Sequence, residues 1–113
     1  MPREDEFCDH VADLLSPLGK ITYRHMFGGF GIYADGRIVA IADDGVLYLK
    51  ADDENRPGFE AAGMEPFRPF PDRDTAMSYY QVPTEALDDQ DRLLGLARTS
   101  LEAAQRSAAR QAD

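Results

Sequence analysis

The stretch RHMFGGFGIY, residues 24–33, places three glycines and three aromatic residues between two strand-like runs. Glycine adopts backbone angles closed to other residues and lets two backbones approach closely, while aromatic rings bring large apolar areas to bury or present. Glycine inside a strand pattern usually marks a bulge or a close backbone contact. We therefore predict a kink or bulge in a β-sheet here. A phosphate-binding loop is disfavoured, because no Lys-Ser/Thr pair follows Gly31 and the required glycine spacing and following helix are missing.

An amphipathic helix is predicted before this stretch, over residues 4–16. Acidic residues fill its first turn, where the helix dipole favours negative charge, and Pro17 with Gly19 supplies a stop. Its apolar residues recur at intervals of three and four, so they line one face of the helix. They are Phe7, Val11, Leu14, Leu15 and Leu18.

Five strands are predicted after the first helix. The dipeptides Asp35-Gly36 and Asp44-Gly45 are strong signals for two-residue hairpin turns. The runs around them are rich in the β-branched and aromatic residues that half-buried strands require. The predicted strands are 21–26, 30–34, 37–42, 46–50 and 77–82. An antiparallel meander is the expected arrangement.

Two further helices are predicted. Residues 52–55 offer the start of a short helix that ends at Gly63, and a long helix covers about 85–108 with Thr84 as a candidate N-cap. Three prolines limit residues 64–74 to an edge strand followed by a loop. The fold class is therefore α+β: a curved antiparallel sheet packed with an N-terminal helix, a short middle helix and a long C-terminal helix. We expect one domain over 1–113, with an ordered core at about 4–104.

The long helix carries a seam of small and apolar residues that can dock on the sheet or, near its end, on a second copy of the chain. The seam consists of Leu94, Ala97, Leu101, Ala104 and Ala108. Docking on its own sheet is the commoner outcome, and a homodimer is the alternative. The tail after Ala104 is expected to fray or project.

Composition limits the classes of partner. Hydrophobic residues make up 43% of the chain and charged residues 29%, which disfavours wholesale disorder. The formal net charge of -9 disfavours nucleic-acid binding, which relies on clustered Lys and Arg. Arg56, Arg68 and Arg73 form no strong basic patch, because acidic residues lie among them. No apolar run is long enough to cross a bilayer, so a cytoplasmic protein without membrane contact is expected.

No arrangement of residues predicts catalysis, a metal or a cofactor. Cys8, His10 and His25 lack the spacing of metal ligands. The acidic pairs at 43–44, 52–53 and 88–89 are explained by a turn and two helix starts. No serine lies in a nucleophile elbow. We therefore expect a protein that is not an enzyme.

Tyr79 and Tyr80 alternate along one predicted strand, so one should lie in the core and the other should be exposed or covered by a helix. An exposed tyrosine beside Arg24 is suited to recognising a ligand or peptide. A sheet edge that accepts a partner strand is a second possible contact surface. The candidate ligand- or partner-binding residues are Arg24, Met26, Phe27, Gly28, Gly29, Phe30, Gly31, Tyr79 and Tyr80.

An alternative hypothesis makes the chain a sensor or enzyme for a small anionic ligand. Arg24 and Arg68 would then pair with the anion near the backbone amides of Gly28 and Gly29, because Arg forms two hydrogen bonds to such groups and free amides add to them.

Four blocks in order, RHMFGGFGIY (24–33), ADDGVLYLK (42–50), FEAAGMEPF (59–67) and MSYYQVP (77–83), resemble the N-terminal domain of the TfoX/Sxy family of bacterial competence regulators. The resemblance spans most of the chain. It implies an α+β domain without a known enzymatic reaction. In the best-known members a helical C-terminal domain follows, and the pair promotes transcription of DNA-uptake genes alongside a cyclic-AMP receptor protein.

The sequence ends at Asp113, before any such second domain, so a stand-alone version is expected. The leading hypothesis is a cytoplasmic, non-enzymatic regulatory module that acts through protein contacts. Its expected partner is a transcription factor or part of the transcription machinery, with direct nucleic-acid binding disfavoured.

Overall fold

The predicted N-terminal helix is present as α1 (Glu4–Leu15), and the chain continues into a 3₁₀ helix, η1 (Ser16–Leu18), that contains Pro17. The structure, a computed structural model, describes residues 4–26, 29–67 and 78–112. Gly19 ends this helical segment with a φ of 144°, which favours glycine. A Cβ there would also lie 2.5 Å from the Asp35 carboxylate, which accepts a 3.0 Å hydrogen bond from the Lys20 N–H.

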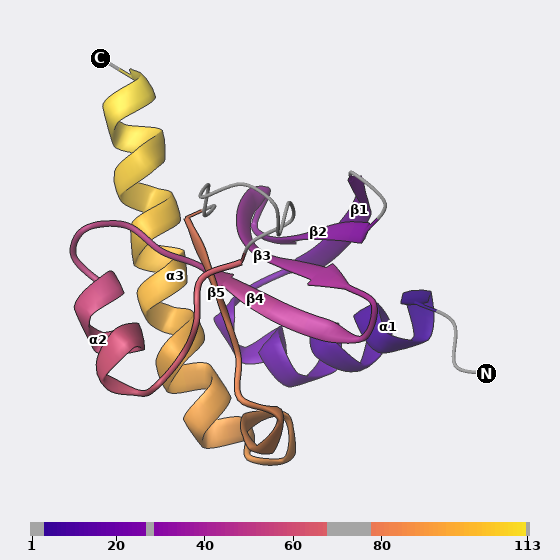
Figure 1. Cartoon of the computed structure of the whole chain (residues 1–113). Helices are drawn as coiled ribbons and strands as arrows, with labels where there is room; N and C mark the ends of the chain where they lie inside the picture. Colours follow the sequence, from indigo (N-terminus) through magenta and orange to yellow (C-terminus); the bar gives the residue numbers. More distant parts are fainter. Residues whose placement is uncertain (1–3, 27–28, 68–77, 113) are drawn as a thin grey trace, which may run out of the picture.

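Five antiparallel strands follow one another in space in the order of the sequence (Figure 1). Their bounds are β1 (Ile21–Met26), β2 (Gly29–Ala34), β3 (Arg37–Asp43), β4 (Val46–Lys50) and β5 (Tyr79–Gln81). The predicted meander is confirmed. The last strand is shorter than the predicted range 77–82, whose first residue lies outside the described part of the chain.

Both predicted Asp-Gly hairpins are confirmed. Asp35 and Gly36 have φ values of 50° and 85°, and Asp44 and Gly45 have values of 52° and 75°. Two successive residues with positive φ are the signature of a type I′ turn, whose twist matches that of the strands it joins. Each turn therefore sets the pairing of its two strands directly.

The glycine-rich strand β2 has the expected close backbone approach, and the expected bulge lies in its pairing with β3. A Cβ on Gly29 would lie 2.6 Å from the Ala42 carbonyl oxygen, so the backbones of β2 and β3 approach too closely for a side chain. A β-bulge follows, because Ile32 pairs with Ala40 while Tyr33 pairs with Ile38. The extra residue is therefore in β3, and a bulge of this kind bends the sheet.

The helix after β4 and the long C-terminal helix are also present. The short helix is α2 (Arg56–Ala61), and the C-terminal region divides into a 3₁₀ helix, η2 (Thr84–Asp88), and α3 (Gln90–Ala112). Thr84 is the first residue of η2, and α3 begins only at Gln90, so its predicted role as N-cap of the long helix is wrong. The chain leaves the helical region at Asp89, whose carboxylate accepts a 3.2 Å bond from the Arg92 N–H and caps α3 instead.

The proline-containing segment after α2 lies along β5, in the region where the sequence predicts an edge strand. Pro66 bridges to Tyr80, the Phe67 N–H donates to the Tyr79 carbonyl at 2.7 Å, and the Gln81 N–H donates to the Glu65 carbonyl at 2.8 Å. These bonds hold residues 65–67 at a fixed position against the sheet.

The hydrophobic core lies between one face of the sheet, here called the inner face, and helices α1, α2 and α3 (Figure 1). Alternate residues of each strand point into it, as the period of two requires. Large side chains with less than 2% exposure include Val11, Leu15, Ile32, Leu47, Leu49, Phe59 and Leu93. α3 continues as a regular helix to Ala112, and its C-terminal end projects beyond the sheet (Figure 1). A homodimer through this end stays a prediction.

A salt bridge ties the loop after β4 to α3. The Arg106 guanidinium donates to both oxygens of Asp52, at 2.7 and 2.9 Å, and its Nε lies 2.7 Å from a Glu54 oxygen. The hydrogen bond from Arg106 is the largest cause that lowers the pKa of Asp52 to about 2, and bonds from the backbone N–H groups of Glu54 and Asn55 add to it. This geometry is bidentate, which is the stronger form of such pairs.

Buried polar side chains extend this connection. Ser100 is fully buried and donates to the Lys50 carbonyl at 2.8 Å, and Asn55 donates to the same oxygen at 3.0 Å. Because both buried side chains form hydrogen bonds, their burial leaves neither of them unsatisfied. The end of β4 is thereby linked to the middle of α3.

We predict that Gly29→Ala lowers the free energy of unfolding by about 1–3 kcal/mol, because the new methyl group forces β2 away from β3. Gly95→Ala is the matched control: a Cβ there meets nothing within 4 Å, and alanine favours the helix by about 0.5–1 kcal/mol. Urea unfolding of both variants measures the difference. Equal stability of the two variants would contradict the close approach.

We also predict a pH dependence from Asp52. Its folded pKa of about 2 lies below its ordinary value of 3.8, so the stabilisation is complete well above pH 3.8 and is lost as the pH falls towards 2. The difference in unfolding free energy between the unchanged chain and Asp52→Asn should therefore shrink over this range. Asp53→Asn is the control, because the Asp53 side chain is 97% exposed beside Arg56. A difference in unfolding free energy that stays constant down to pH 2 would contradict this role of Asp52.

Candidate functional site

The sheet face opposite the core, here called the outer face, carries one row of residues across all five strands. Strand pairing aligns Arg24, Gly31, Ile41, Tyr48 and Gln81 in this row. The α-helices pack on the inner face, so within the described part of the chain none of them lies over this row. Of the candidate residues, Arg24 and Gly31 belong to this row.

Gly31 makes room on the outer face for an aromatic ring. A Cβ at this position would lie 3.1 Å from Tyr33 Cε1 and 3.2 Å from its hydroxyl oxygen. The Arg24 guanidinium carbon in turn lies 4.5 Å from the centroid of the Tyr33 ring, a cation–π contact. Arg24 is exposed, and its guanidinium contacts the Tyr33 ring of the same chain.

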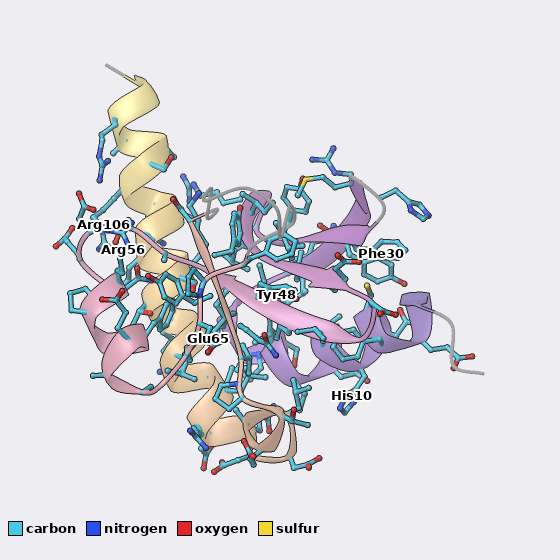
Figure 2. All side chains as sticks on the ribbon, in the orientation of Figure 1. His10, Phe30, Tyr48, Arg56, Glu65 and Arg106 are labelled. Carbon is cyan, nitrogen blue, oxygen red and sulfur yellow. The ribbon has the colours of Figure 1, made fainter. Side chains whose placement is uncertain are left out.

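The glycine-aromatic stretch is divided between the two faces. Phe30 (labelled in Figure 2) is only 6% exposed and belongs to the core. Its ring lies 5.5 Å from that of half-buried Tyr23 and 4.4 Å from that of exposed His25. Met26 is half-buried beside Gly29 at the start of the β1–β2 pairing. The candidate residues Phe27 and Gly28 lie outside the described residues, as does Arg68.

Tyr79 and Tyr80 lie on opposite faces, as predicted, but both are buried. Tyr80 is in the core at 5% exposure and donates a 3.0 Å hydrogen bond to Glu60. Tyr79 belongs to the outer face, yet it is only 9% exposed, with Lys50 Nζ 6.0 Å from its ring centroid. Burial raises the pKa of both phenols. The expectation of one exposed or helix-covered tyrosine in this pair is therefore wrong, because Tyr79 is buried on the face without a helix.

A hollow of about 430 Å³ opens on the outer face beside β5. It is lined by Tyr48, Glu65, Pro66, Phe67 and Gln81 (Figure 2 labels Tyr48 and Glu65). The Tyr48 and Phe67 rings form its aromatic wall, with centroids 4.2 Å apart and planes inclined by 33°. Both rings are half-buried, so each presents part of its surface outward. We call this feature the Tyr48–Phe67 hollow.

The Tyr48–Phe67 hollow has a negative electrostatic environment. Burial is the largest cause that raises the pKa of the Tyr48 phenol, and the nearby carboxylates of Asp43 and Asp44 raise it further. Glu65 adds an exposed carboxyl group at the rim, and Gln81 adds an amide. This is an environment that favours positively charged groups.

Sequence reasoning missed the residues of this hollow. The alternation of Leu47, Tyr48 and Leu49 carried a usable signal, because it places the tyrosine opposite two core leucines. The sequence around Glu65 and Phe67 contains no such signal, because only the pairing of this segment with β5 brings the two residues beside Tyr48.

The residues weighed for chemistry do not converge. Cys8 is buried in α1, His10 is exposed on the same helix, and His25 packs against Phe30. Across residues 4–26, 29–67 and 78–112, no three His, Cys, Asp or Glu side chains are placed to hold a metal ion. The helices in these ranges are also too short or too polar to span a bilayer.

Comparison with known proteins places this fold in a family. A family model described as the TfoX N-terminal domain matches residues 13–104. The chain belongs to this family. The resemblance in the four sequence blocks is thus confirmed, together with the α+β fold of a sheet and three helices.

Two relatives illustrate the range of the TfoX N-terminal domain family. Protein Sxy of Escherichia coli is 28% identical over 102 residues, which cover 81% of this chain and 44% of the relative. DNA transformation protein TfoX1 of Aliivibrio fischeri is 28% identical over 91 residues, which cover 80% of this chain and 44% of the relative. The chain therefore spans less than half the length of each.

We predict that the Tyr48 phenol titrates above its ordinary pKa of 10.0 and that Asp43→Asn lowers this pKa without restoring 10.0, because burial is the larger cause. NMR titration of ring-labelled tyrosine measures it. Asp13→Asn, an exposed change on α1, is the control and should leave the pKa unchanged. No response to Asp43→Asn would contradict the negative environment of the hollow.

Proposed function

We propose that this chain is a non-enzymatic regulatory module that binds a protein partner through the outer face of its sheet. One observation carries the proposal: the helices cover the inner face, while Tyr48 and Phe67 remain partly exposed on the outer face around an open hollow. Partly exposed aromatic residues are enriched at protein interfaces because they combine large apolar area with few rotatable bonds.

Family membership supports a role in controlling DNA uptake. One relative is named as a DNA transformation protein, and the TfoX N-terminal domain family provides the link to this chain. We propose that the domain acts on transcription of genes for DNA uptake, with a transcription factor or part of the transcription machinery as its partner.

The charge of the chain supports a protein partner over nucleic acid. The net charge of -9 repels a phosphate backbone over most of the surface. Two cations of the outer face, Arg24 and Lys50, lie over the rings of Tyr33 and Tyr79. The acidic pairs have structural roles: Asp44 forms a turn, and Asp52 binds Arg106.

We predict that deleting the gene from its native host changes the transcript levels of DNA-uptake genes, and that a chromosomal Tyr48→Ala substitution reproduces most of this change. Tyr48 is half-buried on the outer face, so its loss removes contact area without opening the core. RNA sequencing measures the transcripts, and immunoblotting checks that protein abundance is unaltered. Arg98→Ala, on the exposed side of α3, is the control.

Two results would overturn this function. Unaltered transcripts after deletion would remove the regulatory role. A tight, salt-dependent mobility shift of duplex DNA by the purified protein alone would replace protein contact with direct DNA binding.

A further inference from the structure

We propose that the Tyr48–Phe67 hollow binds an arginine side chain from a basic segment of the partner protein. This inference rests on the proposed function and names the chemistry of the partner. The guanidinium would stack on the exposed surface of this ring pair and form hydrogen bonds to the Glu65 carboxylate.

The first support is the shape of the hollow. Its aromatic wall consists of two rings 4.2 Å apart, and its volume of about 430 Å³ can hold a long side chain. Ligand pockets commonly measure about 300–1,000 Å³. A planar guanidinium is the side-chain cation that stacks best on aromatic faces, whereas an ammonium group is compact and strongly hydrated.

The second support is the pattern of cations on the outer face. Arg24 lies 4.5 Å from the Tyr33 ring centroid, and Lys50 Nζ lies 6.0 Å from that of Tyr79. Two rings of this face thus already carry a cation from the chain itself. Among the described residues no cation lies over Tyr48 or Phe67, whose rings contact each other and are each partly exposed.

The third support is charge. The Glu65 carboxyl group is exposed at the rim, and within the described ranges it takes part in no ion pair and no side-chain hydrogen bond. Asp43 and Asp44 add negative potential at the Tyr48 hydroxyl. Arginine binds carboxylates through two parallel hydrogen bonds, and a net charge of -9 attracts basic segments.

The fourth support is the rigidity of the walls. Backbone hydrogen bonds of 2.7 and 2.8 Å hold Phe67 and Glu65 to β5, while Tyr48 lies in the middle of β4. A site whose walls are held in place before binding loses less conformational entropy when the ligand arrives.

An NMR titration of the full chain with three peptides tests this proposal: hexa-arginine, hexalysine and hexaglutamate. We expect hexa-arginine to shift the amide signals of Tyr48, Glu65, Phe67 and Gln81 with saturation. Hexalysine should bind at least threefold more weakly, and hexaglutamate should cause no shift. Equal binding of the arginine and lysine peptides, or shifts spread evenly over acidic residues, would overturn the proposal.

Substitutions make the test specific. Tyr48→Ala should weaken hexa-arginine binding at least tenfold, and Glu65→Gln should weaken it about threefold and reduce its dependence on salt. Glu6→Gln, which removes an equal charge on α1, should leave binding within twofold. If Tyr48→Ala disturbs the fold, the hexa-arginine affinities of Glu65→Gln and Glu6→Gln still test the proposal. Equal affinities of these two variants would overturn it.

The two proposals fail in different ways. If Tyr48→Ala abolishes the transcript response but the purified chain does not bind hexa-arginine, the arginine assignment is overturned and the regulatory function stands. If the chain binds hexa-arginine at the hollow but gene deletion leaves transcripts unaltered, the regulatory function is overturned and the arginine site stands.

Discussion

Strand register is the constraint on which the rest of this structure depends. Two Asp-Gly turns with positive φ at both residues fix how β2 pairs with β3 and how β3 pairs with β4. Because side chains alternate between faces, a slip of one residue would move Leu47 and Leu49 out of the core and bring Tyr48 into it. The separation of the helix-packed inner face from the outer face therefore follows from two short turns.

The helices stabilise this arrangement from one side only. α1 and α3 pack on the inner face and on each other, and the Asp52–Arg106 salt bridge joins the loop after β4 to α3. Buried Ser100 and Asn55 bind the carbonyl at the end of β4, so the sheet and the long helix are held by directional bonds in addition to apolar packing. One-sided packing keeps the helices away from the outer face.

On the outer face, glycine and aromatic residues have complementary structural roles. Gly29 lets two strands approach closely, and Gly31 accommodates the ring of Tyr33, which in turn contacts Arg24. The Tyr48–Phe67 hollow lies further along the same face, where the segment before β5 completes it. The family match covers residues 13–104, which include every residue that lines this hollow.

The sequence by itself determined the elements whose signals are local: the apolar stripe of the first helix, the two hairpins, the strands they join and the close approach at Gly29. It also carried the four blocks that identify the family. Only the tertiary structure decided which residues meet across long separations. It moved the start of the long helix to Asp89, buried Tyr79 on the outer face, and brought Glu65 and Phe67 beside Tyr48. These outcomes depend on contacts between segments far apart in the chain, and local periodicity carries no information about such contacts.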